Sequence, residues 1–166
     1  MKKLLVLALA LSLCFILLPA CSGGGSSDTQ GGGGNNTQGT KAKTVKTDVF
    51  TMSIPDGWKV AEQTSASVKL EKDTTTLTVE FSQMGFPPPP ENIQKLSYSI
   101  AGYTWTGGIY GDGDNLHFVE AKFTNIDGYC VVFTRGATFE DSDVVKMMES
   151  ITVTNPDAKL PLATFF

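Results

Sequence analysis

Apolar and polar residues alternate along much of the chain after residue 48. Phe50, Met52 and Ile54 are separated by single polar residues, which is the period of a half-buried strand. Turn-forming runs such as Pro55-Asp56-Gly57 and Asn125-Ile126-Asp127-Gly128 separate such segments. Similar patterns predict further strands over residues 58–63, 67–72, 76–84, 105–110, 116–124 and 129–137.

The period changes in the middle of this segment. Ile93, Leu96 and Ile100 stand at helical spacing behind a run of prolines. We therefore predict an amphipathic helix over residues 91–101, ended by Gly102.

A second helix is predicted near the end of the domain. It begins at Asp141 or Ser142, either of which can cap it, and runs through Ser150. Val144 and Met148 lie on its apolar face. Strands, a helix, strands and a helix in this order predict an α+β domain, an antiparallel β-sheet with helices packed on it.

Parts of this arrangement resemble a known family. The strand Phe50–Ile54 leading into Pro55-Asp56-Gly57-Trp58, together with the closing helix Val144–Ile151, is similar to the PsbP-like (Mog-like) domains. The resemblance covers about residues 45–153. It implies an α/β/α sandwich around an antiparallel sheet and a binding or scaffolding role. That family shares no active site that could be carried over.

The amino terminus predicts export. Met1-Lys2-Lys3 precedes an uncharged apolar run from Leu4 to Leu18, as in a secretory signal. The run ends at Leu18-Pro19-Ala20-Cys21, which resembles a bacterial lipobox. The resemblance implies cleavage after Ala20 and fatty acyl chains such as palmitate on Cys21. An ordinary secretory signal or an uncleaved membrane helix are the alternatives.

The residues after Cys21 are almost all Gly, Ser, Asn, Gln and Thr as far as Thr40. With nothing apolar to bury, such a segment does not offset the entropy cost of ordering, so we predict a flexible tether. The predicted organisation is a signal peptide (1–20), a lipid-anchored tether (21–45), a PsbP-like domain (46–153) and a carboxy-terminal tail (154–166).

Charge narrows the class of partner. The chain has 13 basic and 17 acidic residues, and removing Lys2 and Lys3 with the signal leaves 11 basic residues and a net charge of −6. An acidic surface disfavours nucleic acid or anionic lipid as the main partner. Cys130 is then the only thiol besides Cys21, and its apolar neighbours predict that it is buried.

One aromatic stretch is a candidate binding surface. Tyr103, Trp105 and Tyr110 stand among small residues, and aromatic rings give contact area for a glycan or a peptide at low entropy cost. The alternative, which we favour, is that Trp105 and its neighbours fill the core.

Candidate chemistry is otherwise sparse. Asp112 and Asp114 provide oxygen ligands for calcium, but their loop lacks the EF-hand spacing and fits a hairpin turn better. His117 is the only histidine, and no Gly-x-Ser-x-Gly motif or Cys/His cluster accompanies it. The prolines at 87–90 are interpreted as a rigid connector into the helix, the alternative being a ligand for a proline-binding groove of another protein.

These observations favour a non-enzymatic binding or accessory module with no cofactor. Its predicted location is the extracytoplasmic face of the cell membrane, or the outer membrane of a cell that has two. The membrane partner is reached through lipid on Cys21, and a protein or glycan of the cell envelope is the further partner. The alternatives are a secreted hydrolase or metal-dependent enzyme that uses Asp112, Asp114 and His117, and a structural subunit of an envelope complex.

Overall fold

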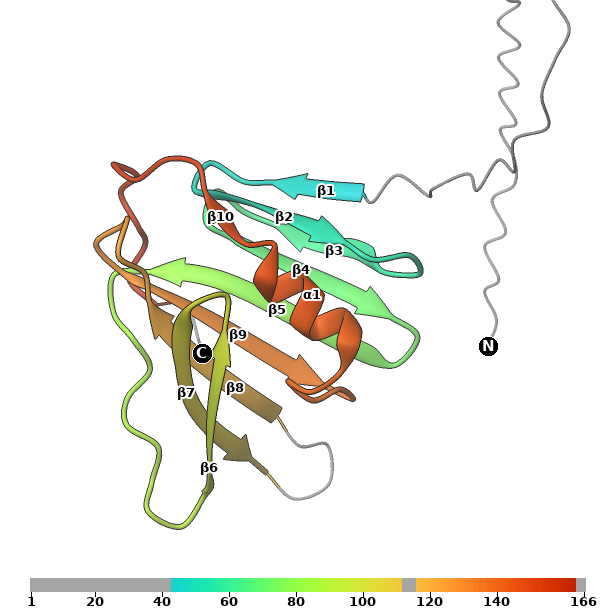
Figure 1. Ribbon diagram of the computed structural model, residues 1–166, viewed down its shortest axis with the longest axis vertical. Helices are drawn as coiled ribbons and strands as arrows, with labels where there is room; N and C mark the ends of the chain where they lie inside the picture. The colour runs from blue at the N-terminus through green and yellow to red at the C-terminus, as the bar shows by residue number, and fades with distance from the viewer. Residues whose placement is uncertain (1–42, 112–115, 164–166) are drawn as a thin grey trace, which may run out of the picture. The chain divides into compact units, whose positions relative to one another are not determined.

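The computed structural model describes residues 43–111 and 116–163 (Figure 1). These residues form ten strands and one helix. The elements are β1 (Lys43–Lys46), β2 (Phe50–Ile54), β3 (Lys59–Gln63), β4 (Ser67–Lys72), β5 (Thr75–Ser82), β6 (Gln94–Ile100), β7 (Tyr103–Tyr110), β8 (Leu116–Lys122), β9 (Tyr129–Arg135), α1 (Ser142–Glu149) and β10 (Thr152–Val153).

The strands form two antiparallel sheets. The larger has seven strands in the order β3-β4-β5-β9-β8-β7-β6, and the smaller has three in the order β1-β2-β10. Pairing between β5 and β9 joins two runs of consecutive antiparallel strands, β3 to β5 and β6 to β9. The connection from β5 to β6 therefore has to travel from the middle of the large sheet to its far edge (Figure 1).

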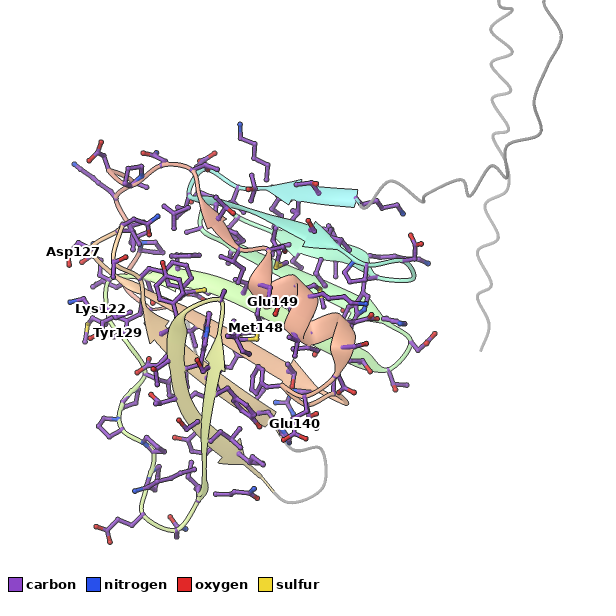
Figure 2. The ribbon with its side chains drawn as sticks, viewed as in Figure 1. Lys122, Asp127, Tyr129, Glu140, Met148 and Glu149 are labelled. Atoms are coloured by element: carbon purple, nitrogen blue, oxygen red, sulfur yellow. The ribbon has the colours of Figure 1, made fainter. Side chains whose placement is uncertain are left out.

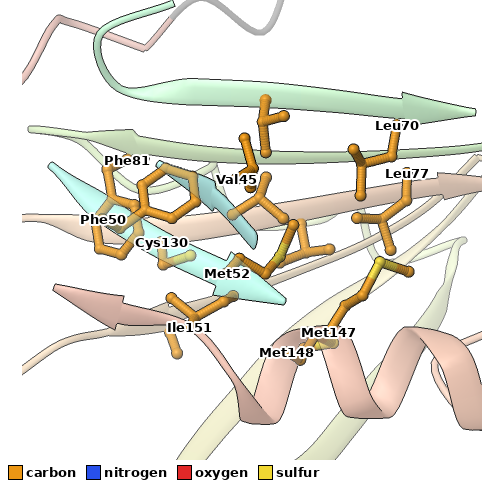
Figure 3. Packing of buried hydrophobic residues seen from close by; sticks show 14 of the residues in the cluster. Val45, Phe50, Met52, Leu70, Leu77, Phe81, Cys130, Met147, Met148 and Ile151 are labelled. Carbon is orange, nitrogen blue, oxygen red and sulfur yellow. The ribbon is translucent and has the colours of Figure 1, made fainter. Parts of the chain in front are cut away.

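The main core lies on one face of the large sheet, which we call the inner face. The small sheet and α1 cover this face, and their apolar side chains interdigitate with those of the large sheet (Figure 3). The Phe50 and Phe81 rings lie 5.1 Å apart between the two sheets. Met147 and Met148 of α1 are almost fully buried against the same cluster. Burial of this much apolar surface is the main stabilising term.

The predicted α+β class is wrong, because the described residues are mostly β and contain a single helix. The segment predicted as the first helix, 91–101, contains strand β6 instead. Leu96, Tyr98 and Ile100 also repeat with a period of two, and this period determines the structure. Gly102, interpreted as a helix end, belongs to the two-residue turn that joins β6 to β7.

The second helix is confirmed. Helix α1 begins after Asp141, which is its N-cap, and ends at Ser150. The Asp141 carboxylate makes no capping hydrogen bond to the helix; it accepts the backbone N–H of Thr138 at 2.6 Å and so fixes the loop before the helix. With only this helix, the described residues do not form the α/β/α sandwich that the PsbP-like resemblance implied.

The ends of the described segment are tied to the sheets. Strand β1 begins at Lys43, inside the range that we assigned to the tether, and pairs with β2. Leu160, in the predicted tail, is buried, and the Gln83 side chain donates to its carbonyl oxygen at 2.7 Å. At the same end of the large sheet, the Lys122 ammonium lies 5.9 Å from the centre of the Tyr129 ring (Figure 2). Within residues 43–111 and 116–163, no helix is long and apolar enough to cross a membrane.

Candidate functional site

A small aromatic cluster occupies the outer face of the large sheet, opposite the main core. Strand register places Phe118 of β8 beside Phe133 of β9, and Tyr110 reaches the same face from β7, with its ring 5.1 Å from that of Phe118. A ring from outside the sheet covers them. Phe86 stacks on Phe118 at 4.4 Å and meets Phe133 edge-on at 5.6 Å.

Phe86 belongs to the connection between β5 and β6, residues 83–93, which we call the proline loop. In Figure 1 it descends from the end of β5 to the start of β6. The Phe86 N–H donates to Oε2 of Glu120 on the sheet. A Cβ atom on Gly85 would lie 2.7 Å from that same carboxylate oxygen, so a larger residue here would displace the Glu120 side chain. The loop is thus held to the outer face by one ring and one hydrogen bond.

A groove of about 510 Å³ lies between the proline loop and strands β6 and β7. We call it the proline groove. Residues 86–89 form one wall, and Phe118 and Glu120 lie below it. The opposite side is formed by Lys95, Leu96, Ser97, Thr106 and Gly107.

Register explains why the polar side chains of the groove lie in one row. Ser97 pairs with Thr106, and Thr106 pairs with Glu120, so these three residues lie abreast across β6, β7 and β8. Ser97 and Thr106 are exposed, whereas Glu120 is half-buried. The row therefore leads from solvent at the sheet edge to a carboxyl group under the proline loop.

Burial raises the pKa of Glu120 above its ordinary value of 4.5, and the hydrogen bond from the Phe86 N–H opposes this shift. The desolvation is the larger effect, because the carboxyl lies between the sheet and the loop. A partly desolvated carboxyl in a groove is a common feature of binding sites. Chemically, it can accept a hydrogen bond from a ligand that enters between the prolines and β7.

The predicted aromatic stretch does not form one surface. Tyr103 and Trp105 point to the inner face, where Tyr103 stacks on Phe123 at 4.1 Å and Trp105 is fully buried. The Trp105 indole N–H donates to the carbonyl oxygen of Ile100 at 3.2 Å. Tyr110 lies seven positions after Tyr103, an odd number, so strand alternation places it on the outer face, beside the proline loop.

The other predicted residues lie apart from the groove. Cys21, Asp112 and Asp114 fall outside the described residues. His117 is half-buried on the inner face of β8, and its Nδ1 is buried with no hydrogen-bond partner in the described part of the chain. Within those limits, no three His, Cys, Asp or Glu side chains are close enough to hold a metal ion.

The prediction that Cys130 is buried is confirmed. Its side chain has no exposed surface and packs in the inner-face core (Figure 3). Burial raises the pKa of the thiol well above its ordinary value, so the nucleophilic thiolate is disfavoured.

A second hollow, of about 250 Å³, lies at the start of α1, and three of its lining residues bond to one another. Asp143 Oδ2 accepts the indole N–H of Trp58 at 3.1 Å and pairs with the Lys72 ammonium at 2.9 Å. These bonds hold the pKa of Asp143 below its usual range. They tie α1 to β4, so we interpret the role of this cluster as structural.

The sequence contains a signal for the groove that pattern reading missed. Phe118 and Val119 are adjacent apolar residues within β8, and both are almost fully buried. Adjacent positions of a strand face opposite sides, so both faces of β8 are covered. Glu120 lies on the same face as Phe118, so the segment that covers Phe118 from outside the sheet also desolvates Glu120.

The comparisons with known proteins assign no family to the chain. No protein-family model, no curated protein and no solved structure matches it.

Proposed function

We propose that the protein is an exported lipoprotein whose domain binds a segment of a cell-envelope protein in the proline groove. Lipid on Cys21 anchors it to the extracytoplasmic face of a membrane. The basic start, the apolar run and the lipobox-like Leu18–Cys21 support the anchor. A diacyl group suffices for stable attachment, because two chains bury enough methylenes where one does not.

The groove carries the proposal for the domain. Its volume of about 510 Å³ falls within the range of ligand sites, and one of its walls is formed by prolines and the ring of Phe86. Apart from Lys95, its polar side chains are few and lie in one row, which ends at the Glu120 carboxyl. The best-fitting ligand is an extended peptide that inserts one large apolar side chain and donates a nearby N–H or ammonium hydrogen to Glu120.

Binding fits the groove better than catalysis. Oε2 of Glu120 already accepts the Phe86 N–H. Lys95, at the rim, is the other titratable side chain that lines the groove. Acid–base catalysis uses a positioned group within hydrogen-bond reach of the reacting atoms, with its proton donor or acceptor partner. The lining offers one carboxyl and the hydroxyls of Ser97 and Thr106, which suits hydrogen bonding to a ligand.

Selection of peptides on the domain tests the groove. A phage library of random 12-residue peptides is panned on residues 22–166, which lack the lipid-bearing cysteine. Affinities of the selected peptides are then measured by isothermal titration. Thr106→Trp fills the groove and should weaken binding at least tenfold, whereas Thr104→Trp should not. Thr104 is also exposed on the same face of β7 but does not line the groove.

The expected peptides share a large apolar residue next to a lysine, an arginine or a side-chain amide. Glu120→Gln should weaken those that carry a lysine or arginine by removing the charged acceptor. Peptides that bind wild type and Thr106→Trp equally, or a panning that enriches none, would refute the groove as the site.

The anchor has its own test. Intact mass spectrometry of protein from the host membrane should give the mass of residues 21–166 plus two or three acyl chains. Cys21→Ala should abolish both the acyl mass and the membrane fractionation. An unlipidated mass for the wild-type protein would contradict the anchor and leave the groove proposal standing.

A further inference from the structure

The two edges of the seven-stranded sheet differ in how open they are. Edge strand β3 has a register shift between Val60 and Glu62 and carries charged residues, both of which discourage pairing with another chain. Edge strand β6 carries one charged residue, Lys95, and has no register shift. All seven of its residues pair in regular register with β7, and its side chains alternate without a bulge.

Backbone groups of three β6 residues point away from the sheet. The two-residue turn after Ile100 makes Ile100 and Tyr103 a hydrogen-bonded pair, so alternate residues of β6 bond to β7. The intervening residues Lys95, Ser97 and Ser99 direct their N–H and C=O groups outward. Their side chains are exposed, and no backbone hydrogen bond connects them to another described segment.

We propose that β6 pairs antiparallel with β6 of a second copy of this chain, around a two-fold axis through Ser97. Ser97 then faces the partner's Ser97, and Lys95 faces the partner's Ser99 on both sides of the axis. The two seven-stranded sheets become one continuous sheet. The same patch serves both copies, as a two-fold dimer requires.

Side chains on both faces fit this register. On the outer face no like charges stand opposite each other, because each Lys95 meets a serine. On the inner face Leu96 meets the partner's Tyr98 at a non-hydrogen-bonded position, where side chains approach most closely. Leu96 and Tyr98 are each half-buried in one copy, so pairing covers apolar surface that one copy leaves in contact with water.

Other registers are worse. An axis through Lys95 would place two ammonium groups directly opposite each other, which is destabilising. An axis through Ser99 would pair Lys95 with Tyr103, which already belongs to β7 and is bonded within the sheet. Only the axis through Ser97 overlaps the whole of Gln94–Ile100 with itself.

The pairing also bears on the proposed groove. Lys95 and Ser97 border the proline groove, so the dimer brings two grooves to the same face of the joined sheet. If lipid anchors both copies, confinement to one membrane raises their effective concentration. This last step rests on the proposed anchor, whereas the strand pairing does not.

Charges introduced at positions 99 and 95, which face each other across the proposed dimer, test the register. The full chain, purified in detergent, is studied by sedimentation equilibrium over a wide concentration range. Wild type should dimerise. Ser99→Lys places a lysine opposite the partner's Lys95 twice per dimer and should weaken dimerisation about tenfold. Adding Lys95→Glu to Ser99→Lys turns each repulsion into an attraction and should restore it.

Thr104→Lys is the matched control, because Thr104 is exposed on the same face but lies on β7, away from the edge. It should leave the dimer constant unchanged. A chain that stays monomeric at every concentration would overturn the pairing, and so would a double variant that fails to recover. Thr106→Trp, which fills the groove, should leave dimerisation intact, so failure of the groove and failure of the dimer are distinguishable.

Discussion

Replacing Phe86 by alanine tests whether one side chain holds the proline loop to the sheet. The ring stacks on Phe118 at 4.4 Å and meets Phe133 edge-on at 5.6 Å. Truncating a fully buried Phe costs about 3–5 kcal/mol, and Phe86 is half-exposed. We therefore expect Phe86→Ala to lower the free energy of unfolding by about 2 kcal/mol, including the lost ring–ring contacts.

Urea unfolding measures this change, with fluorescence of the buried Trp58 and Trp105 as the signal. Met84→Ala is the control, because Met84 lies two residues away in the same loop and is 60% exposed. Its effect should stay within about 0.5 kcal/mol. Hydrogen exchange gives a local measurement, since Phe86→Ala should speed exchange of the amide at position 86 that donates to Glu120.

The result also bears on binding. A loop held in place presents a preformed wall, which reduces the ordering cost when a ligand enters. Phe86→Ala should therefore weaken the selected peptides as well as the fold. A loss of stability no larger than that of Met84→Ala, with unchanged amide exchange, would show that the ring contacts do not fix the loop.

Three further predictions follow from single positions. The pKa of Glu120 is raised in the fold. The contribution of Glu120 to stability is therefore complete below the ordinary pKa of 4.5 and is lost as pH rises through the folded pKa. Glu120→Gln should remove that loss in unfolding curves recorded from pH 4 to pH 8. The pKa of Asp143 is lowered, so the contribution of Asp143 to stability is present above pH 3.8 and is lost as pH falls through the folded pKa. Asp143→Asn should lower the free energy of unfolding by less than about 1 kcal/mol at pH 7, because the pair with Lys72 is partly exposed. In acid the loss should be smaller still. A Cβ atom on Gly107 would overlap the Phe118 carbonyl oxygen, so Gly107→Ala should lower the free energy of unfolding by about 3 kcal/mol or more. Gly108→Ala meets the flexible Ile93 side chain and should lower it less. Thermal melts of the two variants make the comparison.

Alternation predicted strands β2 to β5 and β7 to β9, because their determinant is local, whereas β1, β6 and β10 were missed. In Phe50–Ile54 and Leu77–Phe81, alternation alone identifies the buried side chains, and turn residues mark the ends. The closing helix was predictable for the same reason, since Val144 and Met148 repeat on one face behind Asp141, a residue type that favours the N-cap position. Sheet order was not predictable, because pairing between β5 and β9 joins residues more than 45 positions apart.

The wrong helix and the missed groove have one cause. A helix over residues 91–101 would have placed an apolar stripe on a sheet face, and the prolines before it would have been a simple lead into its first turn. Because Gln94–Ile100 is a strand, it extends the sheet, and no helix of the described residues covers the outer face. The preceding loop then has to cross that face, where Phe86 covers the rings and Glu120. The two-residue period of Gln94–Ile100 therefore decides both where the sheet ends and whether a groove exists beside its edge.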